Sequence, residues 1–457
     1  MVSWNRINMT NTTCFFSSLR SRLGFHYFPD TFHYRESDLQ TYLPEWMSLG
    51  MNWLTLQAPT DRAVPEYFIN GLVNNRIEPI LQFNFSLAQP PAVEEIQLML
   101  ESYSRWGVRL VQFFDRPNAR SSWSSSTWAQ QNLVDRFLDR YLPFANLALD
   151  KGLIPVMPPL QPGGSYWDTA FLRSTLESLE RRKQNRVLQS LVLSAYAWTN
   201  NHPLDWGAGG PDAWPNAHPY MEDPSVQDQR GFHIYDWYES ITQAVLQKSV
   251  PTILYGLGAP SDPAQSGLPL SIGEHTDLNL TLARMLSGDI TNTDNKNAQS
   301  LSPVPSNVLC GCFWLQSAAE KSAFINQAWF RPDGSQMPIV DRLRSWLISH
   351  NEEKPAAAHS IPTKKDPFHP ISHYLLLPVQ EWGVADWKID AIRPFMKRSR
   401  PTVGFSFEEA ALATRVTVFG GENVFPEEKL NDLRRAGCYV ERVGGDGIKI
   451  ASILTER

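Results

Sequence analysis

The feature that most constrains the fold is a series of eight short, apolar, β-rich segments spaced so that a helix fits between each pair. They are Gly24–Phe28, Trp53–Gln57, Pro79–Asn84, Arg109–Asp115, Leu153–Met157, Ser190–Trp198, Pro251–Leu257 and Val308–Gln316. Several are continuous apolar runs, which is typical of parallel strands covered by helices. Amphipathic helical periodicity occupies parts of the intervals, namely Glu94–Trp106, Leu133–Leu147, Ala170–Arg182, Ile234–Gln247 and Met337–Ile348.

Strand and helix alternating eight times predict a closed (β/α)8 barrel of the TIM type over residues 1–350. An open doubly wound sheet gives the same alternation and stands as the alternative. Because 457 residues exceed the roughly 250–300 at which a single core stops growing, a second domain is expected. Residues 351–370 carry no apolar period and are interpreted as a linker. The strand–helix pattern then restarts and predicts a small Rossmann-like α/β domain over residues 371–457.

Composition and charge exclude several classes of function. A net charge of −6 without any basic run lacks the surface that nucleic acid requires. No apolar stretch reaches the length of about 18 residues that a membrane span needs. The first 28 residues show no export-signal pattern, so a cytoplasmic location is one expectation. Histidines without metal-ligand spacing, and no glycine-rich phosphate loop after a barrel strand, predict neither metal nor cofactor.

Polar and aromatic residues gather where the predicted barrel strands end, which is the face that carries active sites in such barrels. The exit of the sixth strand is the densest region, with Trp198, Asn200, Asn201, Asp205 and Trp206. Planar aromatics stack on sugar rings, and Asn and Asp side chains match vicinal hydroxyls. A loop capped by Asn and plugged by Trp is the alternative. Further candidate substrate-binding residues end other strands: His26, Asp30, Gln57, Asn84, Arg116, Asn118, Trp314 and Gln316.

The fourth strand ends in Phe113-Phe114-Asp115-Arg116-Pro117-Asn118, and the aromatic eighth strand ends in Phe313-Trp314. In strand order and in these two motifs, residues 24–350 resemble the large clan (clan A) of retaining (β/α)8 glycosidases. The fourth strand of that clan ends in Asn-Glu-Pro, with the Glu as acid/base, and its seventh strand ends in a nucleophilic Glu. The resemblance implies a glycan site at the strand exits. Here Arg116 stands at the acid/base position, and Thr252–Gly258 contains no carboxylate.

Both clan carboxylates are therefore missing, and this argues against the clan's chemistry. Retaining hydrolysis needs two carboxyl groups about 5–5.5 Å apart, and an arginine neither attacks nor protonates. Asp115 is interpreted either as a general acid/base or as the ion-pair partner of Arg116 or Arg120. If hydrolysis persists, Asp115 and Asp205 form the predicted catalytic pair. Three hypotheses follow: a divergent glycoside hydrolase, a non-catalytic glycan-binding protein, and a structural or envelope-assembly protein without a concave site.

The second predicted domain contains Arg415–Gly421, a helix start at Phe425–Glu428, and Leu433–Asp446. This segment resembles one unit of the cell-wall-binding repeat type 2, which has a strand ending in Val-Gly-Gly, a helix beginning Ser/Pro-Glu-Glu, and a strand ending in Arg-Ile-x-Gly-Asp. The resemblance implies a cell-envelope polymer as a partner and a location at the cell surface. Such units commonly occur in threes, and only one copy is present. An accessory α/β domain that packs on the barrel is the alternative.

Overall fold

A computed structural model describes residues 21–263 except 222 and 224, together with 270–290, 301–353, 371–378, 401–419 and 425–443. The chain divides into two compact units, residues 1–353 and 354–457. Of the predicted linker 351–370, residues 351–353 close the last helix of the first unit, and the remainder lies outside the described residues.

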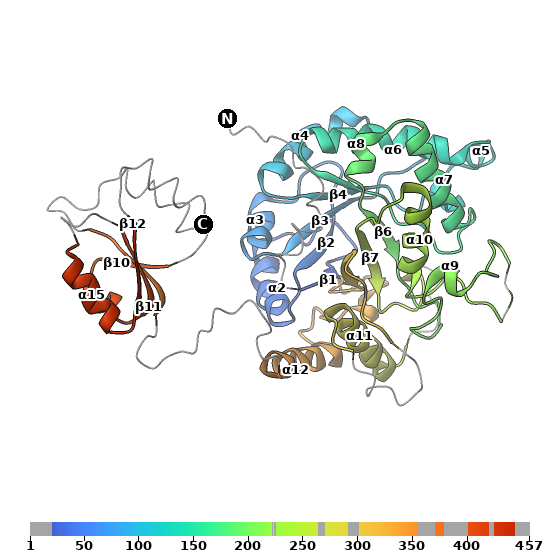
Figure 1. The fold of residues 1–457 in the computed structure, drawn as a ribbon. Coiled ribbons are helices and arrows are strands. Elements are labelled where there is room, and N and C mark those ends of the chain that lie inside the picture. The colour runs from blue at the N-terminus through green and yellow to red at the C-terminus, as the bar shows by residue number, and fades with distance from the viewer. Residues whose placement is uncertain are drawn as a thin grey trace. The chain divides into compact units, whose positions relative to one another are not determined.

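The first unit is built on one parallel sheet with the strand order β5-β4-β3-β2-β1-β8-β7-β6 (Figure 1). A parallel bridge between Val156 and Val192 joins the two ends of this order and closes the barrel. The predicted (β/α)8 barrel is therefore confirmed over the open doubly wound sheet. Its strands are β1 Leu23–His26, β2 Trp53–Gln57, β3 Glu78–Phe83, β4 Leu110–Phe113, β5 Ile154–Val156, β6 Leu193–Tyr196, β7 Thr252–Leu257 and β8 Val308–Phe313.

Helices surround this sheet (Figure 1). They are α2 Glu36–Ser48, α3 Glu66–Asn74, α4 Val93–Arg105, α5 Ser125–Trp128, α6 Leu133–Asp150, α7 Asp168–Arg181, α8 Asn185–Gln189, α9 Gly210–Ala213, α10 Ile234–Leu246, α11 Ile272–Ser287 and α12 Pro338–Glu353, with 3₁₀ turns at Arg120–Ser122 and Ile325–Gln327. The sixth strand begins later than predicted because Ser190 caps α8. Helix α11 begins with a capping box between Ser271 and Glu274 and ends at Gly288 in the left-handed region.

Two apolar layers make the core of the barrel unit. The larger lies between the sheet and the helices, and the smaller fills the barrel interior with side chains such as Trp53, Ile80 and Leu110. Because side chains alternate along a strand, a residue two positions further along the same strand also faces the barrel interior. Gln82 and Gln112 lie two positions after Ile80 and Leu110, so both face the interior near the strand ends and are buried.

The second unit holds a four-stranded parallel sheet in the order β10-β9-β11-β12. Numbered along the chain this order is 2-1-3-4, which is the beginning of a doubly wound order. Its elements are β9 Ile371–Leu376, β10 Thr402–Gly404, α14 Phe407–Ala410, β11 Ala413–Phe419, α15 Glu427–Arg435 and β12 Tyr439–Val443. Residues 379–400, 420–424 and 444–457 lie outside the described residues, and with them the Gly-Gly pairs of the segment that resembles the wall-binding repeat.

A buried carboxylate joins three segments at one side of the barrel. Asp168, the first residue of α7, is fully buried and accepts hydrogen bonds from the Gly163 N–H at 2.9 Å and the Gln229 amide at 2.7 Å. The Tyr238 hydroxyl of α10 donates to its other oxygen at 3.3 Å. Burial raises the pKa of Asp168 to about 6, although these hydrogen bonds oppose the shift. The loop after β5, the long loop after β6 and α10 thus meet at one carboxyl group.

We expect Asp168→Asn to remove a pH-dependent component of stability. The folded pKa lies above the ordinary value of 3.8, so the folded state binds more protons between these two values, and stability rises as pH falls through that window. Above the folded pKa the buried charge costs about 3 kcal/mol, because each tenfold change in proton affinity corresponds to about 1.4 kcal/mol. An Asn oxygen still accepts from Gly163 and Gln229. Urea unfolding from pH 4 to 8 should show the wild type losing stability relative to the variant as pH rises; a pH-independent difference contradicts this account.

Candidate functional site

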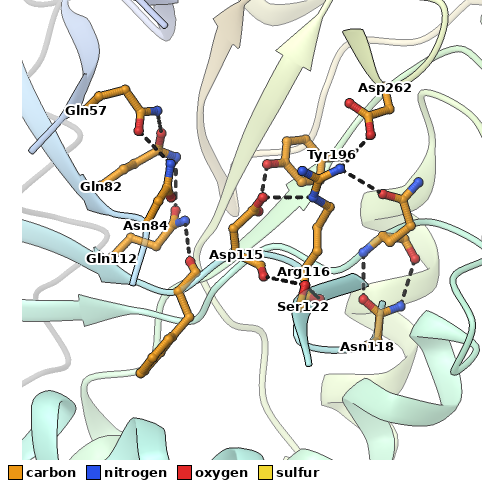
Figure 2. A network of polar contacts seen from close by, with 12 residues as sticks. Gln57, Gln82, Asn84, Gln112, Asp115, Arg116, Asn118, Ser122, Tyr196 and Asp262 are labelled. Atoms are coloured by element: carbon orange, nitrogen blue, oxygen red, sulfur yellow. Dashed lines mark hydrogen bonds and ion pairs between the residues drawn. The ribbon is translucent and has the colours of Figure 1, made fainter. Parts of the chain in front are cut away.

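The chain makes a sharp bend where β4 ends. Phe114 and Arg116 have φ values of 68° and 45°, in a region that residues other than glycine rarely adopt. The Ser122 hydroxyl donates to the carbonyls of Asp115 at 3.3 Å and Arg116 at 2.8 Å, and the Arg116 N–H donates to the Pro159 carbonyl at 3.0 Å. These bonds hold the bend, from which the Asp115 and Arg116 side chains extend toward Tyr196 and Asp262 (Figure 2).

The guanidinium of Arg116 lies between two carboxylates. Its Nε donates to Asp115 Oδ2 at 2.8 Å, and its Nη1 donates to Asp262 Oδ2 at 2.5 Å. The Tyr196 hydroxyl donates to the other Asp115 oxygen at 2.8 Å. The side chains of Arg116 and Asp115 keep 28% and 22% of their surface exposed, and Asp262 keeps 8%. Of the two interpretations of Asp115, the structure shows the ion pair with Arg116. We call Asp115, Arg116, Tyr196 and Asp262 the charged cluster.

Burial and charge act in opposite directions in this cluster. Burial raises the pKa of Asp115, while the Arg116 charge and the Tyr196 hydrogen bond oppose that rise. Burial, together with the Asp115 charge, raises the pKa of Tyr196 well above its ordinary value, so its hydroxyl stays protonated and donates. For Arg116, burial lowers the pKa, but Asp115 and Asp262 outweigh it and the net direction is upward. The cluster is therefore held by one permanent cation whose partners have their oxygens engaged.

A row of amides crosses three neighbouring strands beside this cluster. Gln57 of β2 pairs in register with Gln82 of β3, and Gln82 pairs with Gln112 of β4. Gln57 Nε2 donates to Gln82 Oε1 at 2.9 Å, and Gln82 Nε2 donates to Gln112 Oε1 at 3.2 Å. Asn84 Nδ2 donates to Gln57 Oε1 at 2.6 Å, and Gln112 Nε2 donates to the Phe114 carbonyl at 3.1 Å. We call these four side chains the amide ladder (Figure 2).

Aromatic side chains pack around the same ends of the strands. Trp198 is 2% exposed and stacks on Tyr196 with ring centroids 4.4 Å apart. Trp314 is half-buried and meets the His26 ring edge-on at 5.3 Å. His26 Nε2 accepts the Gly256 N–H at 3.1 Å, and burial lowers the pKa of His26 to about 3, so the ring is neutral. Trp198 is consequently a packing residue, while Trp314 keeps some exposed surface.

Two predicted binding residues are buried in other networks. Asn118 is fully buried; its amide donates to the Gln161 and Tyr166 carbonyls at 2.9 Å each, and its oxygen accepts the Gln161 N–H at 2.8 Å. It thereby holds the loop after β5. Gln316 is also fully buried and accepts the Trp46 indole N–H of α2 at 2.7 Å. Both side chains are therefore engaged inside the protein, Asn118 with a loop and Gln316 with a helix.

Asp30, Asn200 and Asn201 shape loops. Asp30 accepts hydrogen bonds from the Phe32 N–H at 3.0 Å and pairs with His33 Nδ1 at 2.7 Å. Asn200 and Asn201 have φ values of 50° and 61°, a conformation that Asn tolerates better than most residues. These three residues turn the chain after β1 and β6.

Asp205 and Trp206 lie further along the loop that follows β6. Trp206 is half-buried, stacks on His202 at 3.8 Å, and donates its indole N–H to Asp228 at 3.4 Å. Asp205 is half-buried. Among the described residues, no hydrogen bond or ion pair joins its carboxylate to Asp115. Arg116 links Asp115 to Asp262, while the predicted pair of Asp115 with Asp205 stays a prediction.

Sequence reasoning missed four residues of the charged cluster and the amide ladder. One of them, Tyr196, is the last residue of the sixth strand, and the other three also had a signal. Gln82 and Gln112 each follow a run of apolar residues within their strand, at equivalent places near the strand ends. Asp262 is the sole carboxylate between residues 258 and 273, directly after the seventh strand. The sequence alone does not give the register of the strands, so it could not show that these glutamines lie side by side.

Neither a metal-binding cluster nor a membrane-spanning helix is found in the described part of the chain. No group of three His, Cys, Asp or Glu side chains in these segments is arranged to hold a metal ion. None of the helices within them has the length and apolar character needed to cross a membrane.

Comparison with known proteins gives similarity in structure alone: no family model matches the chain, and no curated protein matches it in sequence. A β-galactosidase from the psychrophilic Marinomonas ef1 is 11% identical, with 92% of this chain and 75% of that chain covered and a TM-score of 0.43. Native xylanase 10B from Thermotoga maritima is 11% identical, with 74% and 97% covered and a TM-score of 0.41. An endo-β-1,3-glucanase from Sorangium cellulosum is 11% identical, with 71% and 98% covered and a TM-score of 0.39. These structural neighbours are glycoside hydrolases; the assignment of the barrel rests on its strand order.

We expect Arg116→Met to destabilise the barrel by about 2–3 kcal/mol at pH 8, because Asp115 and Asp262 are left facing each other without a cation. This loss of stability is smaller than the roughly 3–5 kcal/mol typical of fully buried pairs, because Arg116 and Asp115 keep contact with water. The loss should shrink toward pH 5, because burial raises the pKa of Asp115 and so favours the protonated form of its carboxyl group as the pH falls. Urea unfolding at both pH values measures it.

The matched control for this prediction is Arg186→Met, which breaks the exposed ion pair with Asp150 (2.7 Å) and should cost under about 1 kcal/mol. In an Asp115→Asn background the loss from Arg116→Met should fall by about 1 kcal/mol or more, since the two residues interact directly. An equal loss in both backgrounds refutes the coupling.

Proposed function

We propose that the barrel binds a glycan at the ends of its strands and does not carry out the double-glutamate hydrolysis of the clan that its sequence resembles. One observation carries this proposal. Arg116, at the β4 exit where that clan has its acid/base, is tied by ion pairs to Asp115 and Asp262. A permanent cation therefore occupies the place where hydrolysis requires a carboxyl group.

Electrostatics supports binding over hydrolysis. The transition state of glycoside cleavage is oxocarbenium-like and needs negative charge nearby, which a guanidinium opposes. The sequence contains no glutamate from residue 102 to 176 or from 252 to 273, so neither the fourth nor the seventh strand is followed by one. The two aspartates present both form ion pairs with Arg116, so each has an oxygen bound to a cation that stays charged.

The groups around the charged cluster suit a polyhydroxylated ligand. The amide ladder supplies both donors and acceptors, and Gln57 and Asn84 keep contact with solvent. Trp314, at the exit of β8, adds a partly exposed aromatic surface. Neutral donors and acceptors next to an aromatic ring are the usual components of a sugar site.

We also propose that residues 354–457 form an accessory domain of the doubly wound, Rossmann-like kind. The four-stranded sheet order supports the doubly wound part of that assignment. An envelope polymer as a partner of this unit stays a prediction, because part of the segment that resembles the wall-binding repeat lies outside the described residues.

The full chain should bind at least one of cellotetraose, laminaritetraose, xylotetraose and mannotetraose saturably, seen as a shift of tryptophan fluorescence, while releasing no reducing ends above background. Asp115→Asn and Asp205→Asn are assayed beside the wild type, with exposed Asp150→Asn as the matched control. Release that disappears in either site variant, but not in the control, establishes a relocated catalytic pair and refutes the proposal. Neither binding nor release also refutes it and favours the assembly-protein hypothesis.

A further inference from the structure

The amide ladder runs from the protein surface to the backbone of the site. Asn84, at one end, is exposed; Gln57 is half-buried; and Gln82 and Gln112 are 4% and 1% exposed. The ladder ends on the carbonyl of Phe114, the residue directly before Asp115. Four hydrogen bonds thus connect a solvent-facing amide to the peptide from which the charged cluster extends.

The direction of these hydrogen bonds is fixed at the buried end. A backbone carbonyl only accepts, so Gln112 must present its NH₂ group to Phe114 and its oxygen to the neighbouring strand. That oxygen requires a donor, so Gln82 must present its NH₂ group to Gln112. The same reasoning orients Gln57 toward Gln82. The orientation of each amide is therefore fixed by the neighbouring amide that lies closer to Phe114.

The exposed end inherits this direction. Gln57 presents its oxygen outward, so Asn84 must turn its NH₂ group inward and its Oδ1 away from the ladder. Rotating Asn84 alone would place its oxygen against the Gln57 oxygen, which breaks a hydrogen bond and opposes two sets of lone pairs. The bonds of such a chain also polarise one another and strengthen the arrangement. An asparagine in isolation offers a donor or an acceptor equally, whereas this one presents an oriented acceptor.

We propose that Asn84 is a specificity-determining residue whose Oδ1 accepts a hydrogen bond from a hydroxyl of the bound glycan, and that the amide ladder sets this preference from the Phe114 carbonyl. This inference rests on the proposed function. A ligand group that only accepts, such as fluorine or an ether oxygen, meets the Asn84 lone pairs and is disfavoured. Gln112 acts as a positioning residue, because it contacts the ladder and the backbone and not the ligand.

The ligand test uses methyl β-D-glucopyranoside and its 2-, 3-, 4- and 6-deoxyfluoro derivatives, titrated calorimetrically into the full chain. Fluorine replaces a hydroxyl that donates with a group that does not. We expect one derivative to bind about tenfold or more weakly than the parent, since a polar group then faces no partner. Asn84→Ala should weaken the parent by a similar factor and leave that derivative nearly unchanged.

Two substitutions at Gln112 test whether the discrimination depends on the orientation of the amides in the ladder. Gln112→Met removes the group that accepts from Gln82, so the amides above it are free to invert, and the discrimination between parent and derivative should vanish. Gln112→Glu still accepts from Gln82 in either protonation state, so the discrimination should persist. The matched control is Ser194→Ala. Like Gln112, Ser194 lies on a barrel strand and donates to a backbone carbonyl, that of Met157 at 2.6 Å, but it is not part of the ladder.

A ligand-free measurement keeps this inference separable from the proposed function. Side-chain amide NMR resonances of Asn84 should shift and broaden in Gln112→Met but not in Gln112→Glu or Ser194→Ala. Unchanged Asn84 resonances in Gln112→Met, or equal binding of all five glucosides, overturn the ladder's role while glycan binding stands. No binding of any glucoside or tetrasaccharide overturns the proposed function, and the recognition of a hydroxyl by Asn84 with it.

Discussion

The guanidinium of Arg116 is the group on which the end of the barrel depends. It lies at a backbone bend that a non-glycine residue adopts at some cost, and it is the cation between two carboxylates of different strand exits. Without it, Asp115 and Asp262 would repel each other, and the loops after β4 and β7 would lose the ion pairs that join them. The strained backbone is thus retained because the ion pairs it permits join two parts of the barrel.

The charged cluster and the amide ladder meet at the peptide between Phe114 and Asp115. The Phe114 carbonyl fixes the orientation of the amides in the ladder, because Gln112 donates to it. The next two residues, Asp115 and Arg116, form the first ion pair of the charged cluster. A displacement of this peptide changes both at once. This shared peptide explains why a bend with two left-handed residues is held by so many hydrogen bonds, among them those of Ser122.

The sequence was sufficient for the barrel because apolar strands recur at regular intervals and register does not enter that argument. It also singled out Asp115, Arg116, Gln57 and Asn84, which the structure brings into two adjoining networks. It failed where partners come from distant strands. Asp262 is recognised as part of the site only because the loop after β7 lies against Arg116, which follows β4. The glutamines are recognised only through their pairing across β2, β3 and β4. At the aromatic-rich exit of the sixth strand, Trp198 is buried against Tyr196 and packs inside the protein. Ligand binding by the other residues predicted there stays a prediction.

The division of labour between the two networks bears on the kind of ligand the site accepts. The charges of Asp115, Arg116 and Asp262 sum to −1 when both carboxyl groups are ionised, so the charged cluster does not attract an anion. The groups turned outward are amides, which exchange hydrogen bonds with water for hydrogen bonds with a ligand at small net gain per contact. Affinity then comes from several contacts made together, and salt affects it weakly because no phosphate or carboxylate is being neutralised. These conditions favour the neutral, polyhydroxylated ligand that we propose over a polyanion.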